Sequence, residues 1–166
     1  MHLELMPIIA VHATFALTSV LLGPIQALRR TKGDPTHKLI GRIWVIAMAL
    51  TCLTSFAIMH DGLSWLHGLA LFTLISIGLG VSNARRGRIR AHVFNMIGSY
   101  LGTLIAFVFA VLVPTRVIPE LLAKDPFLVA GAFSAIAVVV TVGAAVIIRL
   151  KRPRAAASEE QVLVAS

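Results

Sequence analysis

Five long stretches of the chain contain no Asp, Glu, Lys or Arg, and this pattern constrains the fold more than any other feature. The stretches are residues 5–28, 43–60, 62–84, 91–115 and 126–148. An α-helix needs about 20 apolar residues to cross the hydrocarbon core of a bilayer. The sequence therefore predicts an all-α integral membrane bundle of five transmembrane helices, over about 6–28, 40–60, 63–84, 92–114 and 127–149.

The composition indicates that lipid solvates much of the protein surface. Of the 166 residues, 58% are hydrophobic, and the mean hydropathy is +0.91. Soluble domains contain only about 45–50% apolar residues. We expect a single transmembrane domain over residues 1–154 and a disordered cytoplasmic tail over 155–166. The fifth span is expected to be peripheral and to serve as a scaffold or as the contact face of a homo-oligomer.

The basic residues predict the orientation in the membrane, because cytoplasmic loops are enriched in Lys and Arg. With five spans, thirteen basic residues fall on one side, and only Arg116 and Lys124 fall on the other. This places the N-terminus outside and the C-terminus in the cytoplasm of a bacterial inner membrane. The charge of +8 then meets anionic lipid headgroups rather than nucleic acid. The thirteen residues are Arg29, Arg30, Lys32, Lys38, Arg42, Arg85, Arg86, Arg88, Arg90, Arg149, Lys151, Arg152 and Arg154.

Two segments of the chain resemble each other and indicate an internal duplication. The segment LTSVLLGPIQALRR (17–30) matches LISIGLGVSNARR (74–86) in its small residues, its amide and its paired arginines. Each copy follows a histidine near the outer end of its span, His12 or His67. Each continues to a histidine where the next span begins, His37 or His92. We expect spans 1–2 and 3–4 to be tandem hairpins, related by a pseudo-two-fold axis along the membrane normal.

These four histidines are the candidate functional residues, because an ionisable side chain inside a span is costly and usually has a function. Topology places His12 with His67 near the outer surface and His37 with His92 near the inner surface. Two histidine pairs in a helical bundle could hold two b-type haems and pass electrons across the membrane. This pairing resembles that of the ascorbate-reducible di-haem membrane cytochromes, although the histidines of that family are arranged differently along their helices.

Other interpretations of the same residues remain open. The protein could be a small transporter, or the imidazoles could line a proton or metal-ion pathway together with polar side chains, although the spans contain no Asp or Glu. The protein could also be an accessory subunit without chemistry of its own. His37 could bind lipid phosphate, and His12 could simply form a hydrogen bond with a neighbouring helix. No motif of a hydrolase or ATPase is present, so no catalytic residue is assigned. The secondary polar candidates are Gln26, Asn83, Arg42, Tyr100 and Asn95.

Several short motifs, taken together and in order, resemble a bacterial family of predicted membrane proteins known as domain of unknown function 2306. The resemblance covers residues 12–114 and implies a multi-span membrane protein in which His37 and His92 belong to the family motif. The chain departs from the family pattern at Lys38, Val93 and Asn95. The motifs are LGPIQ (22–26), HKLIGRIW (37–44), RRG (85–87) with His92, and MIGSY (96–100).

Overall fold

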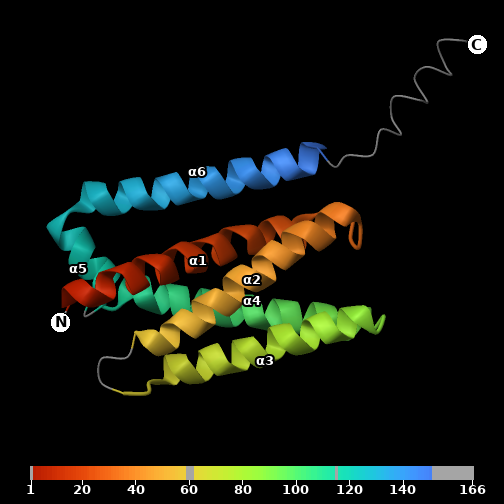
Figure 1. The fold of residues 1–166 in the computed structure, drawn as a ribbon, viewed down its shortest axis with the longest axis horizontal. Coiled ribbons are helices and arrows are strands. Elements are labelled where there is room, and N and C mark those ends of the chain that lie inside the picture. Colours follow the sequence, from red (N-terminus) through yellow and green to blue (C-terminus); the bar gives the residue numbers. More distant parts are fainter. Residues whose placement is uncertain (1, 59–61, 115, 151–166) are drawn as a thin grey trace, which may run out of the picture.

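The computed structural model describes residues 2–58, 62–114 and 116–150, and these residues form six α-helices (Figure 1). Five of the helices are long and apolar enough to cross a membrane. This confirms the predicted all-α membrane bundle of five spanning helices. In chain order the helices are α1 (His2–Leu28), α2 (Pro35–Ala57), α3 (Trp65–Arg85), α4 (Ile89–Leu112), α5 (Val117–Lys124) and α6 (Pro126–Leu150).

Helices α1 to α4 form the central bundle, in which each helix runs antiparallel to the next along the chain (Figure 1). The strongest packing joins α1 with α2 and α3 with α4, and further contacts join α2 with α3 and α1 with α4. Helix α6 lies outside this bundle against α1 and α2. The short helix α5, which the sequence did not reveal, connects α4 to α6. The expectation of a peripheral fifth span agrees with this arrangement.

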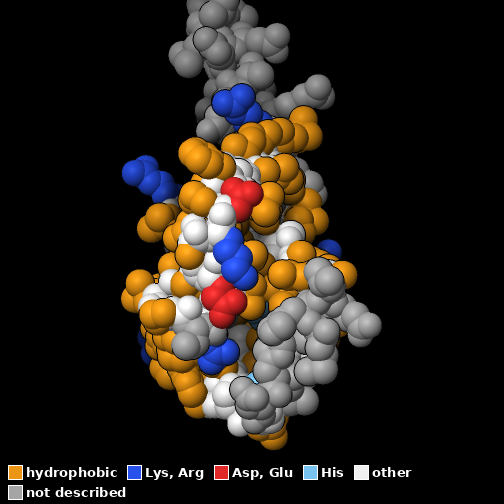
Figure 2. Space-filling view, turned by 90° about the vertical axis from the view of Figure 1, so that its left-hand side faces the viewer, with side chains coloured by type: hydrophobic (Ala, Val, Ile, Leu, Met, Phe, Trp, Pro, Cys, Tyr) orange, Lys and Arg blue, Asp and Glu red, His pale blue; other side chains and the backbone are white. Residues whose placement is uncertain are grey.

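The two ends of the bundle differ in charge. The α1–α2 connection, the α3–α4 connection and the end of α6 lie at one end, here called the basic end (Figure 1). The opposite end, here called the α5 end, carries the basic residues Arg116 and Lys124 beside Glu120 and Asp125. Figure 2 views the α5 end, where acidic and basic side chains form a column across a mainly hydrophobic surface. Lys151, Arg152, Arg154 and the predicted disordered tail lie outside the described residues.

Helix α2 begins at Pro35, five residues before the predicted span, because local capping favours an earlier start. The Asp34 carboxylate accepts a hydrogen bond from the His37 backbone N–H at 2.9 Å, and proline suits the first helical position. Gly33 has a φ of +78°, which glycine adopts at little cost. The helix therefore starts before the uncharged stretch and includes the charged residues that precede it.

The apolar core fills the half of the bundle nearer the basic end. Trp44 and Met48 lie at its centre, with 4% and 0% of their surface exposed. The Trp44 indole N–H donates a hydrogen bond to the Ser19 carbonyl at 2.9 Å. The Thr103 hydroxyl donates to the Met48 sulfur at 3.2 Å, which ties α4 to α2. The remaining buried members of the core are Leu22, Ile40, Ile77 and Ala144.

Close helix packing at Gly23 gives a stability prediction. A Cβ at this position would overlap the ring of Tyr100 on α4, whereas a Cβ at Gly78 on α3 would meet open space. We expect Gly23→Ala to lower the free energy of unfolding by about 1–3 kcal/mol, the usual cost of overpacking. Gly78→Ala is the matched control, because it adds the same methyl group to a helix without a clash. Equal stability of the two variants in detergent unfolding would contradict the close contact.

Candidate functional site

A cavity of about 230 Å³ lies among the four central helices in the half nearer the α5 end. Its lining is mainly apolar and includes the one cysteine, Cys52, and the aromatic rings of Phe107 and Phe133. His12 on α1 and His67 on α3 both line it. The structure therefore brings these two histidines to one cavity, from two helices that are not consecutive in the chain. The other polar side chains of the lining are Thr51, Ser55, Ser64, Thr73, Thr103 and Arg116.

One ring nitrogen of His12 is hydrogen-bonded, and the other has no partner among the described residues. Its Nδ1 lies 3.0 Å from the Thr54 hydroxyl oxygen. That hydroxyl has a single hydrogen, which it donates to the Leu50 carbonyl at 2.6 Å. Thr54 must therefore accept a hydrogen bond from His12 Nδ1–H. The hydrogen-bond network thus leaves the lone pair of His12 on Nε2, the nitrogen through which an imidazole can bind iron.

His67 is bonded differently, because its ring caps α3. Its Nδ1 accepts a hydrogen bond from the Ser64 backbone N–H at 2.9 Å. Its Nε2 lies 3.2 Å from the Ser55 carbonyl oxygen, which can only accept, so Nε2 carries the proton. The ring also packs against Phe56 with 5.6 Å between the ring centroids. In this arrangement His67 ties the end of α2 to the start of α3 and uses both ring nitrogens.

The second pair of histidines lies at the basic end. His92 Nδ1 lies 2.9 Å from the Gly80 carbonyl oxygen, so Nδ1 carries the proton and the Nε2 lone pair is available. His37 Nδ1 is buried and has no hydrogen-bond partner among the described residues. His37 near the start of α2 and His92 near the start of α4 therefore share the basic end of the bundle.

The secondary candidates have separate locations. Gln26 belongs to the basic-end site, since its Nε2 donates to the His37 carbonyl at 2.6 Å. The Tyr100 hydroxyl donates to the Val20 carbonyl at 3.3 Å, which links α4 to α1. Asn95 also bonds within its own helix, donating to the Ala91 carbonyl at 2.8 Å. Asn83 is half-buried near the end of α3, and Arg42 is exposed.

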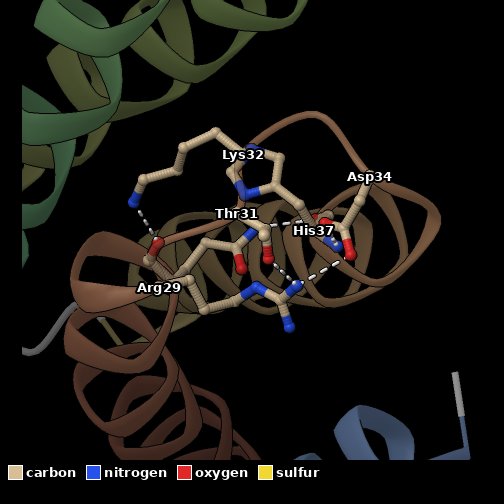
Figure 3. Close-up of polar contacts among 6 residues, drawn as sticks. Arg29, Thr31, Lys32, Asp34 and His37 are labelled. Atoms are coloured by element: carbon tan, nitrogen blue, oxygen red, sulfur yellow. Dashed lines mark hydrogen bonds and ion pairs between the residues drawn. The ribbon is translucent and has the colours of Figure 1, made fainter. Parts of the chain in front are cut away.

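Three residues that the sequence reading did not single out complete the basic-end site (Figure 3). The Arg29 guanidinium forms an ion pair with Asp34 at 2.8 Å, and Lys32 Nζ donates to the Gln26 and Ala27 carbonyls at 2.8 and 2.6 Å. The lysine thereby caps the end of α1. The Asp34-Pro35 pair is a helix-start signal, so the sequence could have predicted Asp34 as the N-cap of α2. It could not have predicted the ion pair with Arg29.

The charge of Asp34 is fixed by these contacts. Desolvation alone would raise the pKa of the Asp34 carboxyl, but the hydrogen bond from the His37 N–H and the attraction of Arg29 outweigh it. The pKa is therefore lowered from its ordinary value of 3.8. The resulting contribution to stability is present above that ordinary value and is lost as the pH falls through the lower folded-state pKa. The ion pair consequently persists at neutral pH.

In the described part of the chain, no three His, Cys, Asp or Glu side chains gather closely enough to hold a metal ion. The two histidine levels are separated by the 17 residues of α2 between His37 and Thr54, about 25 Å of helix.

The fold and the site define a class of protein: a small helical membrane protein whose span histidines gather at two levels. The chain belongs to the family described as "Predicted membrane protein (DUF2306)", whose model matches residues 9–150. This confirms the family that the sequence motifs suggested. No curated protein and no solved structure matches the chain.

Proposed function

We propose that this protein binds b-type haem and carries electrons across the membrane. His12 and His67 hold one haem near the α5 end, and His37 and His92 hold the other near the basic end. The observation that carries the proposal is the convergence of His12 and His67 on one cavity from α1 and α3. The placement of His37 and His92 at the same end of the bundle, on α2 and α4, is consistent with the second pair.

The hydrogen bonds of His12 and His92 favour iron binding. In each, Nδ1–H donates to an oxygen, of Thr54 or of Gly80, and Nε2 remains available. Metal-binding histidines almost always donate their second ring N–H in this way, which fixes the ring orientation and makes the ligand more basic. These two residues are therefore the anchoring ligand of each proposed haem.

Haem binding at the α5 end requires a local rearrangement. The cavity of about 230 Å³ is smaller than the roughly 300–1,000 Å³ of common ligand pockets, so lining side chains must rotate outward. His67 must also release the Ser55 carbonyl and the Ser64 N–H before its ring can bind iron. Haem binding at this site is therefore coupled to the N-terminal cap of α3.

The internal duplication forms part of the proposal and has one further support. Met48 and Thr103 are separated by the same 55 residues as His37 and His92 (103 − 48 and 92 − 37). Their side chains are in contact. Two equivalent residues touch in this way where a two-fold axis passes between them, as tandem hairpins would require.

A proton or metal-ion pathway is less well supported. The cavity is separated from the basic end by packed side chains, among them Trp44 and the fully buried Met48. An ion would have to displace this core, whereas an electron would not. The five uncharged stretches also lack the carboxylates that usually carry protons or cations through membranes.

We further propose that the basic end faces the cytoplasm of a bacterial cell and lies against anionic lipid headgroups. Labelling of single cysteines would test this orientation in a Cys52→Ala background. In intact cells, a membrane-impermeant maleimide should label Leu122→Cys on α5 and should leave Thr31→Cys in the α1–α2 connection unlabelled. Both positions are exposed, so accessibility within the protein does not bias the comparison. Labelling of Thr31→Cys alone would reverse the proposed orientation.

Electron transfer can be measured in lipid vesicles that contain the purified protein. With ferricyanide trapped inside and dithionite outside, ferricyanide should be reduced much faster than in empty vesicles. His12→Ala and His37→Ala should each bring the rate close to that of empty vesicles, because each interrupts one of the two steps. Gly78→Ala should retain the wild-type rate. An unchanged rate in both histidine variants would exclude the proposed pathway.

A further inference from the structure

Three polar atoms at the basic end are buried and have no hydrogen-bond partner among the described residues. They are Gln26 Oε1, Arg29 Nε and His37 Nδ1. Buried polar atoms in native proteins nearly always have a partner, either within the protein or in an ordered water molecule. The residues of all three atoms are linked through the start of α2, so a common partner would satisfy them together.

Hydrogen bonds tie the side chains of Gln26 and Arg29 to the first turn of α2. Figure 3 shows Arg29, Asp34 and His37 there. Gln26 Nε2 donates to the His37 carbonyl at 2.6 Å. Arg29 Nη2 donates to one Asp34 oxygen at 2.8 Å, and the other Asp34 oxygen accepts from the His37 N–H at 2.9 Å. The side chains of Gln26 and Arg29 are thus both tied to the segment that carries the His37 ring.

The chemistry of the three atoms restricts the partner. Arg29 Nε–H can only donate, Gln26 Oε1 can only accept, and His37 Nδ1 can do either. A carboxylate or phosphate ion would satisfy Arg29 but would face the Gln26 oxygen without a hydrogen to offer. A metal cation would face the Arg29 charge. A water molecule can accept from Arg29, donate to Gln26 and bond to His37, and buried waters typically make about three such bonds.

We propose that an ordered water molecule links His37 Nδ1 to Gln26 Oε1 and Arg29 Nε, and that Gln26 and Arg29 position His37 through it. The consequence for haem rests on the proposed function. When His37 Nε2 binds iron, Nδ1–H donates to the water, which fixes the ring and raises the basicity of the ligand. Gln26 and Arg29 then tune the reduction potential of the haem at the basic end in opposite directions.

The opposite directions follow from the charges. Gln26→Leu removes the group that accepts from the water, so the imidazole becomes a weaker ligand for ferric iron and the potential rises. Arg29→Gln removes a positive charge that favours the reduced state, so the potential falls. We expect each variant to change the ratio of reduced to oxidised haem about tenfold, which is about 59 mV for one electron. The potential of the haem at the α5 end should not change.

Two further variants separate the water from other effects. Arg29→Gln also breaks the ion pair with Asp34, whereas Arg29→Lys keeps the charge and the ion pair but removes the Nε–H. Thr31→Ala is the matched control, because Thr31 Oγ1 contacts Arg29 Nη2 at 3.1 Å but not the three unpartnered atoms.

The test that does not need haem is nitrogen NMR of haem-free protein with ¹⁵N-labelled histidine, with His37 assigned from His37→Gln. Gln26→Leu and Arg29→Lys should both shift the His37 Nδ1 resonance, and Thr31→Ala should not. If the resonance moves but the protein never binds haem, the water site stands and the proposed function fails. If neither variant moves the resonance, the water link is overturned, whether or not haem binds.

Discussion

His12→Ala and His67→Ala should each remove the same haem, and each variant should retain the other haem at full occupancy. One axial imidazole is rarely sufficient to hold a b-type haem whose iron is ligated on both sides, so loss of either partner empties the site. The haem content per chain should therefore fall from two to one in both variants. The measurement is the ratio of haem to purified protein, combined with a redox titration that identifies the remaining haem.

The controls for this prediction separate ligation from folding. Ser64→Ala alters the cap of α3 without removing an imidazole and should retain both haems. His37→Ala and His92→Ala should both remove the haem at the basic end. If His12→Ala loses a haem while His67→Ala keeps both, the pairing of these two histidines is wrong. His67 would then serve only as the N-terminal cap of α3.

Trp44→Ala should lower the free energy of unfolding by about 3 kcal/mol, close to the lower limit for replacing a buried aromatic residue with alanine. We use the lower limit because lipid tails are about as apolar as the protein core. The substitution therefore removes packing contacts, and a hydrophobic transfer term adds little to its cost. Trp44→Phe should cost only about 1 kcal/mol, mainly from the lost hydrogen bond to the Ser19 carbonyl. Reversible unfolding in detergent micelles is the measurement.

Trp65 provides a control with the same side chain in a different environment. It is 53% exposed and touches the Phe109 ring edge-on, so Trp65→Ala should cost about 1 kcal/mol or less. Similar losses at Trp44 and Trp65 would contradict the central position of Trp44. A large loss at Trp44 alone would confirm that the core between the two histidine levels holds the bundle together.

The fold could be predicted from the sequence because a long stretch without charged residues determines where a helix crosses the bilayer. A stretch such as 62–84 has few alternatives to a spanning helix. The number of spans then determines which connections share an end, and this alone placed His12 at the same end as His67 and His37 at the same end as His92. The helix α5 was missed because its eight residues are too short to span and contain Pro119.

The details of the site could not be predicted, because they depend on single side-chain conformations. Nothing in the sequence distinguishes His12, whose Nε2 is free, from His67, whose two nitrogens are both bonded. That difference arises because His12 Nδ1 bonds to the Thr54 hydroxyl, whereas His67 Nδ1 accepts from the Ser64 backbone N–H. The contacts of Arg29 with Asp34 likewise depend on how the chain turns at Gly33. Sequence spacing identifies the levels of the histidines but not their bonding.

The most direct measurement is the visible absorption spectrum of the detergent-purified protein, produced with ample haem and recorded before and after reduction by dithionite. We expect a Soret band that shifts on reduction, with sharp α and β bands and two haems per chain. A featureless spectrum from well-folded protein would contradict the central claim. The four histidines would then be left with the structural contacts described above.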